Sequence, residues 1–112
     1  MPNQFEVTDP RGRRVICTED KWRWHIVSKH GKYMEGYEDE VKQAIQEPNP
    51  GIFEDTQRPN RNSYYLRLPR SRKYIKVVVN FSDESEGYVV TAFKTDSVKR
   101  GEKQIWPTST DS

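Results

Sequence analysis

The stretch from Lys73 to Phe81 constrains the fold most, because apolar and polar residues alternate along it as they do in a β-strand. Its apolar face would consist of Ile75, Val77, Val79 and Phe81. Its other face is mixed and would carry Tyr74, Lys76, Val78 and Asn80. A strand of this kind buries one face against a second layer and can leave the other face open.

Three further strands are predicted in the second half of the chain. Runs of β-prone residues between turn signals place them at Ile52 to Asp55, Ser63 to Leu68 and Tyr88 to Thr95. The links at 69–72 and 82–87 are short, so we expect an antiparallel meander. A hairpin is also expected at the N-terminus, because two β-prone runs flank a turn that contains proline and glycine.

Two helices are predicted between that hairpin and the later strands. The first covers about 19–30, with Thr18 as its cap and Gly31 at its end. The second covers about 37–47, where Tyr37, Val41, Ala44 and Ile45 have helical spacing. The predicted fold is therefore α+β: two N-terminal helices packed on a roughly four-stranded antiparallel sheet, with an N-terminal hairpin.

The composition fits one small domain with a thin core. The chain has 112 residues, of which 32% are hydrophobic, so we expect a single domain over 1–112 with its core at about 5–96 and a loose tail at 97–112. No run approaches the roughly 18 to 20 apolar residues of a membrane span, and we expect no membrane association. The lone Cys17 cannot form an internal disulfide, which favours a cytoplasmic location. Two histidines and one cysteine are too few ligands for a structural zinc site, so no metal or cofactor is expected.

Positive charge is concentrated in one segment. Residues 57–76 carry seven basic side chains and no acidic one, whereas the net charge of the whole chain is only +2. Cations interleaved with tyrosines are typical of surfaces that neutralise RNA phosphates and stack on bases. The residues predicted to bind RNA are Arg58, Arg61, Arg67, Tyr74 and Lys76. A solvated sheet face whose tyrosines cover the core has the same composition. The sequence favours neither the RNA-binding surface nor the solvated face over the other.

The two histidines are candidates for proton transfer near neutral pH. His25 and His30 lie five residues apart on the first predicted helix, where His30 falls on the apolar arc and His25 beyond its edge. Taken singly, each is more often a packed or solvated residue than a catalytic one. Thr91 lies in the last predicted strand and can offer a hydroxyl to a phosphate, although threonine is also an ordinary strand residue.

Several strings, taken in order, resemble the small phage- or toxin-associated members of the barnase/EndoU/colicin/RelE superfamily of ribonucleases. The strings are Trp24-His25-Ile26, Lys29-His30, Ala44 to Pro48, Ile52 to Asp55, Tyr64-Tyr65, Tyr74 to Val79 and Gly87 to Phe93. The resemblance spans roughly residues 20–96. It implies an α+β fold with N-terminal helices on a four-stranded antiparallel sheet, and a metal-independent site for RNA cleavage on the exposed sheet face.

The resemblance also implies a mechanism. A base takes the proton from the ribose 2′-OH, that oxygen attacks the adjacent phosphorus, and an acid protonates the leaving 5′-oxygen. The implied site residues are His25 and His30 for proton transfer, Tyr65 for stacking or proton-transfer support, Thr91 as a donor to phosphate, and Arg61, Arg67 and Lys76 as phosphate contacts. Which histidine is the base stays open. A cognate inhibitor protein is a second expected partner beside RNA.

Two other functions use the same residues. A binding module would hold RNA on the basic, aromatic face without cutting it. An interaction domain would use the acidic second helix and the basic strands against opposite patches on a partner, including a second copy of the chain. The sequence leaves the oligomeric state open.

Overall fold

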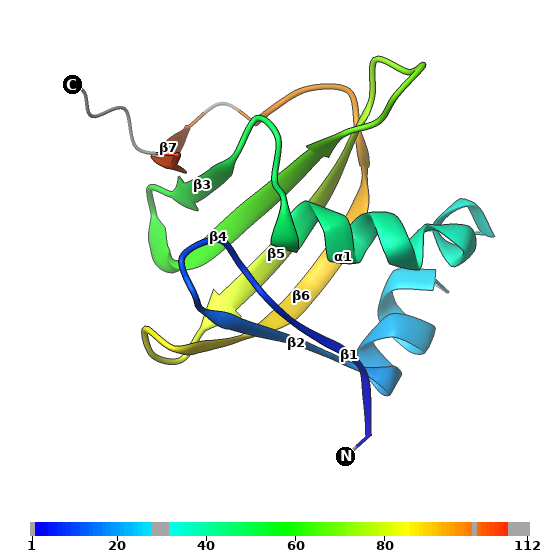
Figure 1. Ribbon diagram of the computed structural model, residues 1–112, viewed down its shortest axis with the longest axis horizontal. Helices are drawn as coiled ribbons and strands as arrows, with labels where there is room; N and C mark the ends of the chain where they lie inside the picture. The colour runs from blue at the N-terminus through cyan, green and yellow to red at the C-terminus, as the bar shows by residue number, and fades with distance from the viewer. Residues whose placement is uncertain (1, 28–31, 100, 108–112) are drawn as a thin grey trace.

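The computed structural model describes residues 2–27, 32–99 and 101–107. The strands are β1 (Asn3–Thr8), β2 (Arg14–Thr18), β3 (Ile52–Asp55), β4 (Arg58–Arg67), β5 (Tyr74–Phe81), β6 (Glu86–Thr95) and β7 (Glu102–Trp106). The helical segments are η1 (Lys21–Val27), η2 (Lys32–Tyr37) and α1 (Glu38–Gln46). Together they form an α+β structure with one large sheet (Figure 1).

The sheet has seven strands in the order β1-β2-β6-β5-β4-β3-β7. It is mixed, because β2 pairs with β6 in parallel, whereas the other neighbours are antiparallel. The predicted sheet of about four antiparallel strands is therefore wrong. The prediction failed because side-chain alternation identifies a strand but does not say which distant strand it pairs with.

Two further expectations need correction. The helices are not N-terminal, because the β1–β2 hairpin precedes them and joins the main sheet through β2. Residues 97–112 were expected to form a loose tail, but Glu102–Trp106 within them form β7, which pairs with β3. The apolar Ile105 and Trp106 of β7 pack against the core, which explains why this part of the chain is ordered.

Two of the helical segments, η1 and α1, lie in the predicted helices with different bounds, whereas η2 covers the link before the second one, where no helix was predicted. A π-helical turn, η1, occupies Lys21–Val27 of the first predicted helix, and residues 28–31 lie outside the described residues. The α-helix α1 lies inside the predicted range 37–47, and its acidic first turn suits the positive end of the helix dipole. No described helix is long and apolar enough to cross a membrane.

The core lies between one face of the sheet and α1. Helix α1 crosses β4 and β5 and also contacts β1 (Figure 1). The predicted apolar faces of α1 and β5 meet there, and the fully buried residues include Val41, Ala44, Ile45, Ile75, Val77 and Val79. Burial of these aliphatic side chains is the main favourable term for such a layer.

A polar cluster attaches the β1–β2 turn to the centre of the sheet. The Asp9 side chain is 0% exposed and accepts a hydrogen bond of 2.7 Å from the Tyr64 hydroxyl. The Arg11 guanidinium donates to the same carboxylate at 2.8 Å and to the Tyr64 hydroxyl at 3.1 Å. Burial, and then the hydrogen bond to Asp9, raise the pKa of Tyr64. The N-terminal hairpin is thus held to β4 as well as to β6.

Gly51 lets the chain pass close to β7, and its replacement tests that contact. Gly51 has φ = 153°, and a Cβ atom there would lie 2.0 Å from the carbonyl oxygen of Trp106. We expect Gly51→Ala to lower the free energy of unfolding by about 1–3 kcal/mol through strain and overlap. Urea denaturation measures this. Gly36→Ala is the control, because a Cβ atom there meets nothing within 4 Å; equal effects of the two substitutions would contradict the expectation.

Candidate nucleic-acid interface

Several of the predicted site residues share the sheet face that points away from α1. We call it the outer face, and its central residues are Ser63, Tyr65, Arg67, Tyr74, Lys76, Val78, Thr91 and Phe93. In register, Tyr65 lies opposite Lys76 and Arg67 lies opposite Tyr74. Strand alternation and the pairing register together therefore place Tyr65, Tyr74, Lys76 and Thr91 on one surface.

Aromatic rings surround the lysine at the centre of the outer face. The ring centroid of Tyr65 lies 5.3 Å from that of Phe53 and 6.2 Å from that of Tyr74, both in edge-to-face geometry. The Lys76 Nζ atom lies 5.4 Å from the Tyr65 centroid and 5.9 Å from the Phe93 centroid. Cation–π attraction and edge-to-face packing hold these groups in a defined arrangement.

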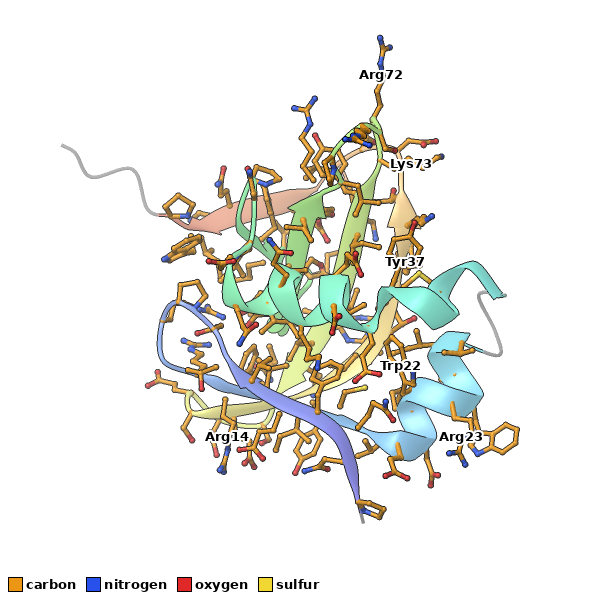
Figure 2. All side chains as sticks on the ribbon, turned by 45° about the vertical axis from the view of Figure 1, so that its right-hand side comes forward. Arg14, Trp22, Arg23, Tyr37, Arg72 and Lys73 are labelled. Carbon is orange, nitrogen blue, oxygen red and sulfur yellow. The ribbon has the colours of Figure 1, made fainter. Side chains whose placement is uncertain are left out.

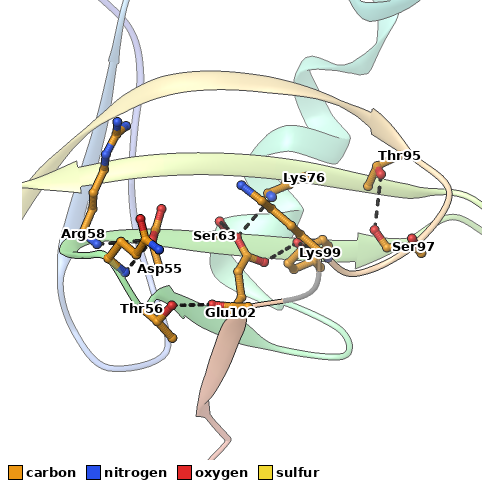
Figure 3. A network of polar contacts seen from close by, with 12 residues as sticks. Asp55, Thr56, Arg58, Ser63, Lys76, Thr95, Ser97, Lys99 and Glu102 are labelled. Atoms are coloured by element: carbon orange, nitrogen blue, oxygen red, sulfur yellow. Dashed lines mark hydrogen bonds and ion pairs between the residues drawn. The ribbon is translucent and has the colours of Figure 1, made fainter.

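Glu102 of β7 is bound to three residues of this face (Figure 3). Its Oε1 atom accepts a hydrogen bond of 2.6 Å from the Tyr65 hydroxyl. Its Oε2 atom accepts one of 3.0 Å from Ser63 Oγ and one of 3.2 Å from Lys76 Nζ. The side chains of Lys76 and Glu102 are only 8% and 6% exposed. Two residues predicted to act on RNA, Tyr65 and Lys76, are thus buried and paired here.

The environment of Tyr65 keeps its phenol protonated. Burial, and then the hydrogen bond to the Glu102 carboxylate, raise the pKa of Tyr65. The backbone N–H of Lys99 donates to the Tyr65 hydroxyl oxygen at 3.2 Å and opposes that shift. Tyr65 therefore serves as a hydrogen-bond donor in this structure. Sequence reasoning missed Glu102, because it lies in the segment taken for a tail.

Arginines gather at the end of the β4–β5 hairpin. They border a depression of about 530 Å³, here called the hairpin hollow, whose lining is Asn49, Arg67, Leu68, Pro69, Arg70, Ser71 and Arg72. Within residues 2–27, 32–99 and 101–107, none of its three arginines forms an ion pair with an acidic side chain. Arg70 has φ = 60°, a left-handed conformation uncommon outside glycine. Arg72 extends from the tip of the hairpin (Figure 2).

The remaining cations of the basic segment do not join this cluster. Arg58 is exposed at the other end of β4, beside the turn that Asp55 stabilises through hydrogen bonds from the backbone N–H groups of 57 and 58. Arg61 is half-buried and lies opposite Asn80. Lys73 forms an exposed ion pair of 2.6 Å with Asp96. The ten residues of β4 separate Arg58 from the hairpin hollow, so the continuous basic segment becomes two separate surfaces.

The candidate proton-transfer residues lie around β6. His25 is half-buried on η1, which packs against β6, the strand that carries Thr91. Thr91 is half-buried on the outer face, and β5 separates it from Tyr65 on β4. His30 lies outside the described residues. The structure therefore brings the element of His25 next to the strand of Thr91.

Other chemistry has weaker support in the described part of the chain. Burial raises the pKa of the Cys17 thiol to about 12, so it is not a thiolate nucleophile at neutral pH. The described residues contain no group of three or more His, Cys, Asp or Glu side chains arranged to hold a metal ion.

Comparisons with protein-family models, with curated proteins and with solved structures find no match for this chain.

The raised pKa of Tyr65 predicts a loss of stability at alkaline pH. Below about pH 10 the phenol is neutral in both states; above it, unfolded tyrosines ionise and the free energy of unfolding falls, by at most about 1.4 kcal/mol per pH unit for each such tyrosine. Tyr65→Phe should therefore lose less stability than wild type between pH 8 and 11. Urea denaturation across that range measures this. Tyr88→Phe, at an exposed position, is the control, and parallel curves for Tyr65→Phe and wild type would refute the assignment.

Proposed function

We propose that this protein binds RNA and cleaves it as a metal-independent endoribonuclease. The observation that carries the binding step is the hairpin hollow, which three arginines border with no acidic partner among the described residues. A guanidinium group matches the geometry of a phosphate and can donate two parallel hydrogen bonds to it. An unpaired arginine cluster is thus suited to a phosphate backbone.

The outer face extends this surface. Arg67 belongs both to the hairpin hollow and to the outer face, where it lies opposite the half-buried Tyr74. Phosphates in the hollow would place a base near Tyr74, and base–aromatic stacking contributes about 1–3 kcal/mol per base. This arrangement favours single-stranded RNA, whose bases are free to stack. The proposal includes a cytoplasmic location, where such RNA is present.

The cleavage step rests on the resemblance described above and on the elements around β6. His25 and His30 are the proposed proton-transfer groups, and Thr91 is the proposed donor to a phosphate oxygen. The packing of η1 against β6 places the helix of His25 beside the strand of Thr91, and the proposed mechanism requires the base and the phosphate donor to lie close together. Attack by the 2′-OH would leave a 2′,3′-cyclic phosphate on the product.

Binding without cleavage is the second candidate, and one observation favours it. Tyr65 and Lys76, two of the residues proposed to act on RNA, are held by Glu102 away from solvent. In this conformation neither can contact a phosphate directly. Cleavage assays separate the two functions.

Charge reversal in the hairpin hollow tests the binding step. We expect Arg70→Glu and Arg72→Glu to weaken binding of a short single-stranded RNA and to flatten its salt dependence by about 0.7 log units per log unit of salt for each lost phosphate contact. Fluorescence anisotropy between about 50 and 200 mM salt measures this. Lys42→Glu is the control, since Lys42 lies on α1, which covers the face of the sheet opposite the outer face. Equal losses for all three variants would count against the hollow.

Histidine substitution in the presence of EDTA tests the cleavage step. Loss of a general acid or base lowers the rate by about 10² to 10⁴, so we expect such a loss in His25→Ala or His30→Ala. Thr91→Ala should slow cleavage if its hydroxyl contacts phosphate. Single-turnover cleavage of mixed RNA, with circular dichroism to verify folding, measures these effects. Folded wild-type protein that leaves all RNA intact would support binding alone.

A further inference from the structure

Glu102 occupies a place suited to an anionic ligand. Two hydroxyl groups, from Ser63 and Tyr65, and the ammonium group of Lys76 all donate to its carboxylate. The phosphate group offers the same chemistry as this carboxylate, with anionic oxygens that accept charge-assisted hydrogen bonds. The donors therefore form an anion site that an acidic side chain of the same chain fills.

The strands that carry the three donors are fixed more firmly in the sheet than the strand that carries Glu102. Ser63 and Tyr65 lie on β4 and Lys76 on β5, which have partners on both sides in the middle of the sheet. Glu102 is the first residue of β7, an edge strand that pairs only with β3 among the described strands. The β3–β7 register is irregular between Ile52 and Phe53. Short edge strands of this kind open at a lower free energy than central strands.

The filled site is continuous with the proposed RNA surface. Tyr65 lies two residues before Arg67 on the same face of β4, which separates their Cα atoms by about 7 Å. A phosphate in place of Glu102 would also lie beside the rings of Tyr65 and Phe93 that surround Lys76. An RNA strand bound in the hairpin hollow could therefore extend onto this site.

We propose that Ser63, Tyr65 and Lys76 form a second phosphate site, which Glu102 closes in this structure and which RNA occupies when strand β7 is displaced. This inference rests on the proposed RNA-binding function. Replacement of a carboxylate by a phosphate keeps Lys76 compensated, whereas simple opening of β7 would leave a buried charge without a partner. With Glu102 in place, strand β7 thus lowers the affinity of the protein for RNA. It also favours ligands that supply a phosphate to replace the carboxylate.

Glu102→Gln tests the closure. The amide keeps the shape of the side chain but removes the charge that pairs with Lys76. We expect the affinity for a short single-stranded RNA to rise about tenfold, as for one added charge-assisted hydrogen bond, and the salt dependence to steepen by about 0.7 per added phosphate contact. The matched control is Glu86→Gln, which also removes a negative charge from beside a cation, Arg14, but where β2 pairs with β6, on the other side of the sheet's centre from β7. Equal effects of the two variants would overturn the proposal.

A reversible cross-link tests the same idea without disturbing the cluster. Glu54 of β3 and Lys103 of β7 are paired in register, and antiparallel partners lie within the Cα separation that a disulfide spans. In Glu54→Cys/Lys103→Cys, oxidation should hold β7 in place and lower RNA affinity, and reduction should restore it. Unchanged affinity on reduction would overturn the proposal, even if Glu102→Gln does not fold.

Tripolyphosphate separates this inference from the proposed function. Its binding, measured by calorimetry, should be tighter to Glu102→Gln than to wild type and weaker to the oxidised cross-linked protein than to its reduced form. If these differences in tripolyphosphate affinity are seen but no RNA binds, the second phosphate site is supported and the RNA-binding function is refuted. RNA binding that depends on Arg70 and Arg72, but not on Glu102 or the cross-link, would keep the function and refute the second site.

Discussion

The ion pair between Glu102 and Lys76 both attaches strand β7 to the sheet and limits access to the outer face. It joins an edge strand to the centre of the sheet and buries both charges, with the Tyr65 hydroxyl completing the carboxylate's hydrogen bonds. Loss of one partner from a buried ion pair typically costs about 3–5 kcal/mol, because the other charge stays in a poorly solvated site. The same contact covers the part of the outer face that is richest in aromatic rings and hydroxyl donors. Stability and access to this face are therefore coupled.

A second contact of the same kind lies on the other side of the sheet. Tyr64 and Tyr65 are adjacent in β4, so their side chains point to opposite faces, and each donates its hydroxyl to a carboxylate from a terminal part of the chain. Tyr64 binds Asp9 in the β1–β2 turn, whereas Tyr65 binds Glu102 in β7. This tyrosine pair holds both terminal segments to the middle of the sheet. The Asp9 carboxylate is paired with Arg11, which is close to it in sequence, and this cluster lies against the core. The Glu102 carboxylate is paired with Lys76, which lies on a different strand of the outer face.

The division of the basic residues follows from the length of β4. Its two ends carry different cations, so Arg67 with Arg70 and Arg72 forms one surface, and Arg58 lies on another. Lys73 and Lys76 are neutralised by Asp96 and Glu102, which come from beyond the basic segment. The surface suited to phosphate is consequently smaller than the net charge of the segment indicates. It is also more local, because Arg67, Arg70 and Arg72 all border one hollow at the end of the hairpin.

Local pattern by itself determined much of this protein: the alternation of β5, with Tyr74 and Lys76 on its mixed face, the amphipathic helix α1 and the N-terminal hairpin. Those features follow from side-chain periods of 2 and 3.6 residues, which a short window of sequence contains. Only the tertiary structure decided the parallel pairing of Arg14–Ile16 with Glu86–Tyr88, and the return of Glu102 to Lys76. These contacts join residues far apart in the chain. Their free energy depends on desolvation and geometry in three dimensions, which no local pattern records.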